Sequence, residues 1–314
     1  MALGRWVIKG SALAWDMPRL AKCFTTLFIT LILFTTPLNA EQEDDDIWDV
    51  EGGYSIIMEE YTATWCEICA SVDSWMPDYT KANGNRVIRI AIHDTFDDPM
   101  GTPITDFRLQ KYNISLVTPS FWFDGDMLAG GSPDTTTLHR SLLSAENKRQ
   151  GDTGINLRVK HYSGELYISS ILSDWSSELD TKITFMILYN SVNLPLNLAE
   201  NGVEQHHDVL FAYNEIYLNN SSNWAHPESS WSNILVQNNT ISSQFKIPSE
   251  SYFDNLKVVV IHEYVDYNEN SPSTLGATSL SLGGDYQLSK IDLYLPIIII
   301  LLISITPIII QSRR

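Results

Sequence analysis

Between residues 54 and 148, short apolar runs alternate with stretches in which apolar residues recur at helical spacing. The runs at 55–61 and 87–93 are the clearest, because each has the length and composition of a buried strand. Strands that alternate with helices are typical of an α/β layer. We expect strands at residues 55–61, 87–93, 120–123 and 127–129, and helices at residues 66–82, 104–112 and 135–147.

The pattern changes near residue 150. Beyond it, short runs rich in Val, Ile, Tyr and Thr are separated by turn residues such as Ser163-Gly164 and Gly283-Gly284. Several short strands without clear helices indicate an antiparallel β-sandwich. We therefore expect two domains, an α/β domain and an all-β, sandwich-like domain, at residues 53–149 and 150–290. The strands of the second domain are expected at residues 155–161, 165–172, 182–189, 209–218, 241–247, 256–264 and 278–282.

An apolar run lies near the start of the chain. Residues 23–38 follow Arg19 and Lys22 and precede Ala40. A positive flank, an apolar stretch and a small residue before a polar segment are typical of a secretory signal peptide, here residues 1–40. The alternative is an uncleaved anchor helix, and both interpretations place the residues after this segment outside the cytoplasm.

A second apolar run lies at the other end. Residues 293–310 are almost entirely Leu and Ile and are followed by two terminal arginines. Eighteen helical residues reach about 27 Å, close to the thickness of the hydrocarbon core of a bilayer. We expect a transmembrane helix at 291–311 and a cytoplasmic tail at 312–314. The protein is thus predicted to be a single-pass protein of the cell membrane with its ectodomain outside the cytoplasm.

The net charge and the sequence motifs limit which partners and cofactors we expect this protein to bind. Residues 41–292 hold 14 Lys and Arg against 37 Asp and Glu, a net charge of −23, which repels nucleic acid and anionic lipid headgroups, so we expect neither as a partner. Within them, residues 41–52 are predicted to be a solvated acidic spacer.

His206-His207 is the obvious candidate metal pair, but neighbours on a strand point to opposite faces, so we expect no metal. Without a phosphate loop or dinucleotide fingerprint, we expect no cofactor.

The cysteines carry the most specific chemistry. Cys66 and Cys69 form a Cys-x-x-Cys pair, and the one other cysteine, Cys23, lies in the expected signal peptide. A scaffold of structural disulfides needs more cysteines, and a tetrahedral zinc site needs a second ligand pair. At a helix N-terminus, unpaired N–H groups would lower the pKa of Cys66, so that it attacks a partner disulfide and Cys69 resolves the product. Glu67 opposes this pKa shift by like-charge repulsion.

Two segments resemble the thioredoxin family. Residues 60–69, Glu-Tyr-Thr-Ala-Thr-Trp-Cys-Glu-Ile-Cys, resemble its strand, tryptophan and Cys-x-x-Cys. Residues 117–125 resemble its second hallmark, a cis-proline followed by an apolar strand and a turn. The resemblance covers about residues 50–149 and makes the first domain thioredoxin-like. Residues 91–94 and 206–210 resemble, more weakly, segments of secreted bacterial surface proteins that join such a domain to a β-rich one, and this supports the two-domain arrangement.

The resemblance implies a substrate-binding edge. By position, Pro119 would pack beside the cysteines, and the Thr118 backbone would pair with the substrate chain. Trp65 would bind substrate beside the first cysteine. This chain departs from the family in the dipeptide between the cysteines, Glu-Ile, and in an insertion-like acidic loop at residues 94–103. These departures leave the direction of electron flow open.

The resemblance also implies a catalytic acid. Glu60 lies six residues before Cys66, where the family often carries a buried carboxyl that passes protons to the inner cysteine. Burial would raise its pKa, which suits proton transfer near neutral pH. The alternative is that Glu60 is solvated and Glu59 points inward.

These features predict an enzyme. The expected function is that of a membrane-tethered thiol–disulfide oxidoreductase, acting through Cys66 and Cys69 on thiols and disulfides of secreted or membrane proteins. The alternative is a non-enzymatic surface binding or adhesion protein in which the Cys66–Cys69 disulfide is permanent. The reduction potential of the pair distinguishes the two.

Overall fold

The computed structural model of the chain describes residues 46–112, 117–127, 131–149, 151, 153–176, 179–219, 222–266 and 273–283. The expected signal peptide, transmembrane helix and cytoplasmic tail lie outside these residues. Among the residues that are described, none of the helices combines the length and the apolar character needed to cross a membrane.

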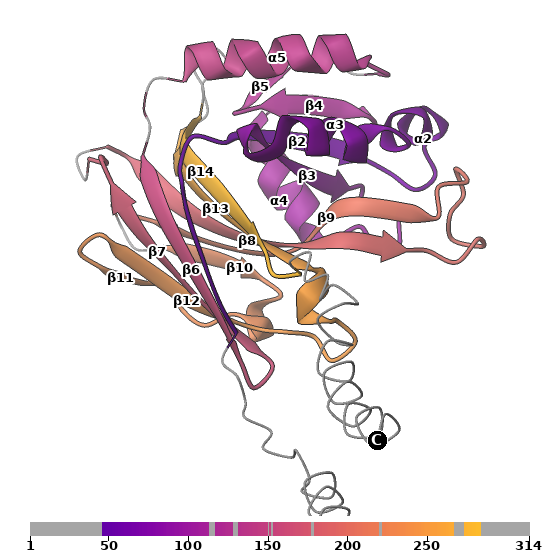
Figure 1. Ribbon diagram of the computed structural model, residues 1–314. Coiled ribbons are helices and arrows are strands. Elements are labelled where there is room, and N and C mark those ends of the chain that lie inside the picture. Colours follow the sequence, from indigo (N-terminus) through magenta and orange to yellow (C-terminus); the bar gives the residue numbers. More distant parts are fainter. Residues whose placement is uncertain are drawn as a thin grey trace, which may run out of the picture. The chain divides into compact units, whose positions relative to one another are not determined.

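Five strands form an antiparallel sheet in the order β1-β6-β7-β12-β11 (Figure 1). Its first strand covers the end of the expected acidic spacer, whose residues there pair with β6 instead of extending into solvent. The strands of this sheet are β1 (Asp46–Gly52), β6 (Gly154–Tyr162), β7 (Glu165–Ser173), β11 (Leu235–Gln237) and β12 (Thr240–Lys246).

A second, nine-stranded sheet has the order β14-β13-β8-β9-β3-β2-β4-β5, with β10 paired to β9. The β2–β3 and β3–β9 pairs are parallel, and the others are antiparallel. Its strands are β2 (Ile56–Thr62), β3 (Val87–His93), β4 (Ser120–Phe123), β5 (Asp126–Met127), β8 (Thr181–Asn193), β9 (Gln205–Tyr217), β10 (Asn223–His226), β13 (Leu256–Tyr264) and β14 (Thr274–Ser281).

The helices follow the sequence pattern with one interruption. The single helix expected at 66–82 is broken at Ser74 and Trp75, because Pro77 lies in the first turn of a new helix, where its missing N–H is tolerated. The described α-helices are α2 (Glu67–Asp73), α3 (Met76–Asn83), α4 (Pro103–Leu109) and α5 (Thr135–Lys148). The 3₁₀ turns are η1 (Gly84–Arg86), η2 (Gln110–Tyr112), η3 (Glu228–Ser230) and η4 (Phe253–Asn255).

The three larger hydrophobic clusters of the described residues hold these elements together. One fills the space between the five-stranded sheet and β8, β9 and β13. A second lies under α4, against β2, β3 and the opposite face of β8 and β13. The third joins α2, α3 and α5 to the other face of β2, β3 and β4. The nine-stranded sheet is therefore covered on both faces, which explains why all seven residues of β2 and of β3 are buried.

The expected fold class is wrong. The chain is not a thioredoxin-like α/β domain followed by a separate β-sandwich, because strands dominate the described residues and form two sheets. Strands from both halves share the larger sheet, in which β9 pairs with β3 beside Ala91 and Val209. β3 is buried on both faces and would otherwise expose a free edge, so the later strands extend its sheet. Periodicity gives the faces of a strand but not its neighbours, and this is why the sequence pattern suggested two domains.

Candidate functional site

The two cysteines form a disulfide in the turn between β2 and α2. The Cys66–Cys69 bond joins Cα atoms 5.2 Å apart. Cys66 is the N-cap of α2, and its Sγ accepts a hydrogen bond from the backbone N–H of Cys69 at 3.1 Å. Cys66 is 6% exposed and Cys69 is fully buried, so the first cysteine is the more accessible of the two, as expected, although both are largely covered.

Asp98 fixes the backbone before the cysteines. One carboxylate oxygen accepts hydrogen bonds from the N–H of Thr64 at 2.8 Å and from His93 Nδ1 at 2.9 Å. The other accepts the N–H of Met100 at 2.8 Å. Burial opposes ionisation of Asp98, but these hydrogen bonds and the His93 ring outweigh it and hold the pKa of Asp98 below its ordinary value. The insertion-like loop 94–103 thus supports the cysteine turn.

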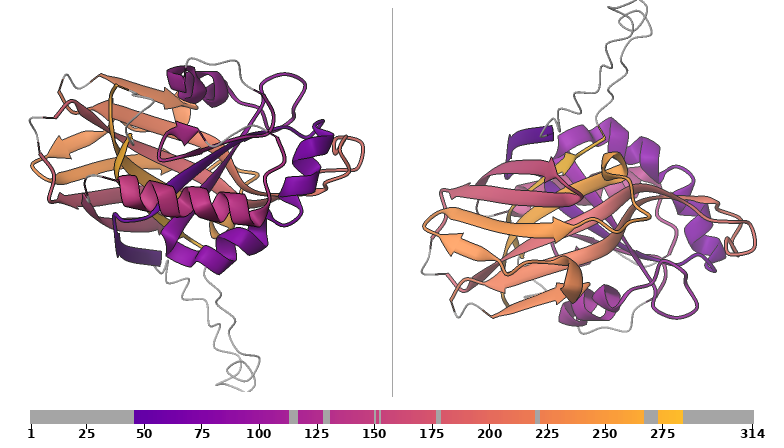
Figure 2. Two further views of the ribbon diagram at one scale, coloured as in Figure 1. Left: turned by 90° about the horizontal axis from the view of Figure 1, so that it is seen from above. Right: turned by 90° about the horizontal axis from the view of Figure 1, so that it is seen from below.

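Asn201, in the loop between β8 and β9, also holds this turn. Its Nδ2 donates to the carbonyl oxygens of Ala63 at 3.3 Å and Cys66 at 3.2 Å, and its backbone N–H donates to Thr64 at 2.8 Å. Both views in Figure 2 show this loop beside the purple α2–α3 segment. The sequence interpretation missed Asn201, because it lies 135 residues from Cys66 and belongs to no recognisable motif.

Glu60 is buried, as expected, directly below this turn. It is 0% exposed and accepts a 2.6 Å hydrogen bond from Arg89, which also donates to Asp73 of α2 at 2.7 Å. Burial raises the pKa of Glu60 to about 7, with Arg89 lowering it and Asp73 raising it further. Glu59 does not replace it, since both carboxyls are buried, on opposite faces of β2. Exchange of protons between Glu60 and Cys69 stays a prediction.

The expected substrate-binding residues lie at the same end of the sheet. The Thr118–Pro119 peptide is cis and directly precedes Ser120, which pairs with Tyr61 at the end of β2. The Pro119 carbonyl accepts the Gly131 N–H at 2.9 Å. The next residue, Ser132, contacts Ser71 of α2 through the two hydroxyls at 3.1 Å. These two hydrogen bonds link the segment at Pro119 to helix α2.

Trp65, the third expected substrate-binding residue, lies on the surface. Its side chain is 37% exposed, and its indole N–H donates to the carbonyl of Phe96 at 3.0 Å. Phe96 itself is 72% exposed, so the two aromatic residues present an apolar surface next to Cys66. Whether this surface binds substrate stays a prediction.

We expect the replacement Glu60→Gln to flatten the pH dependence of stability. With a pKa of about 7 in the folded chain against an ordinary 4.5, folded Glu60 binds more protons than unfolded Glu60 between these values. Stability therefore falls as pH rises from about 4.5 to 7, and glutamine removes that contribution. Urea unfolding at a series of pH values measures it, with exposed Glu228→Gln as control. An unchanged slope in Glu60→Gln would contradict the assignment.

The histidine pair is split between two environments. His206 is buried and its ring lies edge-on to His93 at 5.3 Å, whereas His207 contacts the Asn190 carbonyl at 3.2 Å. Within the described ranges, no group of three or more metal-binding side chains comes together. Nothing in this part of the chain suggests which residues would hold a metal.

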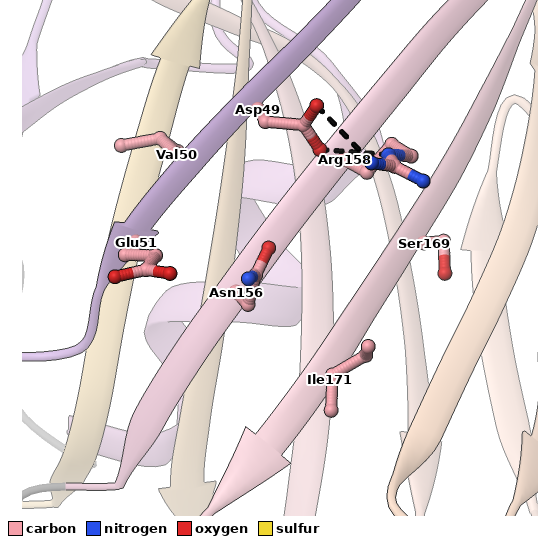
Figure 3. A pocket seen from close by; sticks show the side chains of 7 residues that line it. All are labelled: Asp49, Val50, Glu51, Asn156, Arg158, Ser169 and Ile171. Carbon is pink, nitrogen blue, oxygen red and sulfur yellow. Dashed lines mark hydrogen bonds and ion pairs between the residues drawn. The ribbon is translucent and has the colours of Figure 1, made fainter.

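A groove of about 300 Å³ lies away from the cysteines, on the five-stranded sheet (Figure 3). Asp49 and Arg158 cross it as an ion pair at 2.7 Å, and both side chains are largely exposed. Its remaining lining residues are Val50, Glu51, Asn156, Ser169 and Ile171. The groove is open, and its one basic side chain, Arg158, already pairs with Asp49, so the cysteine turn is the better candidate site.

Comparisons with known proteins define the fold and nothing finer. No family model matches the sequence, and no curated protein matches it. HBP35 of Porphyromonas gingivalis has a similar structure, with a TM-score of 0.54 and 13% identity over 76% of this chain and 78% of that one. Protein AGR_C_4864 from Agrobacterium tumefaciens gives a TM-score of 0.51 and 13% identity over 74% and 96%. The chain thus shares an overall fold with these two proteins.

Proposed function

We propose that the protein is a thiol–disulfide oxidoreductase that acts through Cys66 and Cys69 on protein partners. The observation that carries this proposal is the Cys66–Cys69 disulfide at the N-cap of α2, held by Asp98 and Asn201. Backbone N–H groups at such a position favour a thiolate once the disulfide is reduced. The local resemblance of residues 60–69 and 117–125 to the thioredoxin family supports the same chemistry.

The exchange proceeds in two steps. In the reduced protein, the Cys66 thiolate attacks a partner disulfide, forms a mixed disulfide and releases one partner thiolate. Cys69 then loses its proton and attacks the Cys66 sulfur, which restores the Cys66–Cys69 disulfide and releases the second partner thiol. Two electrons pass to the partner, and the reverse sequence oxidises a partner dithiol. Glu60 is the proposed proton acceptor for Cys69, since a carboxyl with a pKa of about 7 exchanges protons near neutral pH.

The proposed place of action is the outer side of a membrane. The apolar runs at 23–38 and 293–310 support a secreted domain tethered to the cell membrane. Its partners would be secreted or membrane proteins with thiols or disulfides, docking at Trp65, Thr118 and Pro119. The strongly acidic composition argues against nucleic acid.

A second candidate is a binding protein with a permanent disulfide. The specific observation in its favour is burial, because Cys66 is only 6% exposed and Cys69 is inaccessible. A disulfide packed in this way reacts slowly unless the turn opens. The two candidates predict different reduction potentials.

Equilibration with glutathione buffers separates these candidates. For an oxidoreductase, we expect a potential between about −270 and −120 mV, the range of known exchange proteins. A value below about −300 mV would favour the permanent disulfide. The fraction of reduced Cys66 and Cys69 is read by alkylation and mass spectrometry at each glutathione ratio.

A further inference from the structure

Large apolar side chains are exposed on four segments near the disulfide. They come from the cysteine turn, the loop after β3, the segment before β4 and the loop between β8 and β9. Their exposed fractions run from 37% to 74%, although residues of this size are usually buried. We call these six residues the rim: Trp65, Ile68, Phe96, Val117, Leu196 and Leu198.

Described contacts hold the rim segments around the cysteines. The Trp65–Phe96 hydrogen bond ties the loop after β3 to the turn. Asn201 ties the β8–β9 loop to the Cys66 carbonyl, three residues after Leu198. That loop is closed at its base by a 2.7 Å hydrogen bond from the Leu194 N–H to the Glu204 carbonyl. In Figure 1 its tip lies at the same end of the protein as α2.

The charged residues in the four segments that carry the rim are all acidic. Residues 63–69, 94–101, 117–119 and 194–204 contain no Lys, Arg or His. Asp98 is buried and already bonded, whereas the other carboxylates are exposed or partly exposed. The acidic residues of the four segments are Glu67, Asp94, Asp97, Asp98, Glu200 and Glu204. An apolar surface edged only by carboxylates complements a ligand that is both apolar and cationic.

We propose that the rim binds polypeptide segments in which a cysteine is flanked by apolar and basic residues, and that the β8–β9 loop determines this specificity. The proposal rests on the exchange function and names its substrate class. Burial of apolar side chains on the rim supplies affinity, while the carboxylates raise the encounter rate and reject acidic segments. The loop acts at the disulfide because Asn201 fixes it there.

The test uses the reduced full-length chain with Cys23 and Cys69 replaced by serine, so that Cys66 is its single thiol. Three matched peptides carry one cysteine bonded to nitrothiobenzoate, flanked by Lys and Leu, by Glu and Leu, or by Lys and Ser. Attack by Cys66 forms the Cys66–peptide disulfide and releases the coloured thiolate. Each rate is divided by the rate of the same peptide with a neutral small thiol, which removes the intrinsic reactivity of the peptide.

We expect the Lys–Leu peptide to react on the order of tenfold faster than the other two at low ionic strength. The preference over Glu–Leu should shrink near 1 M salt, where charges are screened beyond about 3 Å. Equal normalised rates would overturn the specificity and leave the exchange function intact. No release with any peptide would overturn exchange itself. Slower release at higher chain concentration would show that a second copy covers the rim, which also contradicts the proposal.

Variants of the β8–β9 loop test whether this loop determines the peptide preference. Leu196→Ser with Leu198→Ser should remove the preference for Leu over Ser, whereas Leu235→Ser, on the five-stranded sheet and 57% exposed, should keep it. Glu200→Lys should reduce the preference for Lys over Glu, and exposed Glu228→Lys is its control. All these side chains lie at the surface, so the variants test binding without removing a core contact. Unchanged preferences in both loop variants would exclude the loop as the determinant.

Discussion

Replacing Cys69 with serine is expected to leave partner proteins covalently held on Cys66. Without the second thiol, the mixed disulfide has no internal attacker, and resolution slows on the order of a hundredfold or more. Trapped species are separated on non-reducing gels after alkylation of intact cells and identified by mass spectrometry. Release by a reductant confirms that the link is a disulfide.

The matched control is Cys66→Ser, which keeps one cysteine of the pair but removes the more accessible one. It should trap no partner, because Cys69 is completely covered. If Cys69→Ser and Cys66→Ser retained equal sets of proteins, the order of the two steps would be wrong. If neither retained any protein, the permanent disulfide would be the better interpretation of this site.

Replacing Arg108 with methionine is expected to cost about 3–5 kcal/mol of unfolding free energy, because it removes the closest cation of two buried carboxylates. Arg108 on α4 is 2% exposed and donates to Glu59 of β2 at 2.6 Å and to Glu263 of β13 at 3.0 Å. Burial opposes ionisation of both acids, but Arg108 holds the pKa of each below its ordinary value. Methionine fills similar volume, so the loss is mainly electrostatic.

A surface pair provides the control for this variant. Arg158 and Asp49 also form an ion pair at 2.7 Å, but the Arg158 side chain is 65% exposed. Replacement of Arg158 with methionine should cost far less than replacement of Arg108, since solvent screens exposed pairs. Urea unfolding followed by tryptophan fluorescence measures the unfolding free energy of both variants. Similar losses of unfolding free energy for the two variants would show that the ion pairs of Arg108 with Glu59 and Glu263 do not hold the two halves of the larger sheet together.

The neighbouring acids Glu59 and Glu60 show that the sequence pattern does not determine how many faces of a strand are buried. Only one of them was expected to be buried, because adjacent residues on a strand point to opposite faces. Both are buried, since β2 lies inside a sheet that is covered on each side. Glu60 meets Arg89 below the cysteine turn, and Glu59 meets Arg108 beneath α4. The alternation was correct, but the number of covered faces depended on strands far along the chain.

The sequence alone determined the local chemistry of this protein. It located the Cys66–Cys69 pair, most of the strands and helices around it and the Thr118–Pro119 segment, because turn residues, periodicity and short motifs act over a few residues. Tertiary structure decided which strands share a sheet and which distant residue reaches the cysteines. β9 joins β3, and Asn201 thereby contacts the turn at Cys66. Such pairing depends on the whole set of exposed edges and apolar faces, which no local pattern contains.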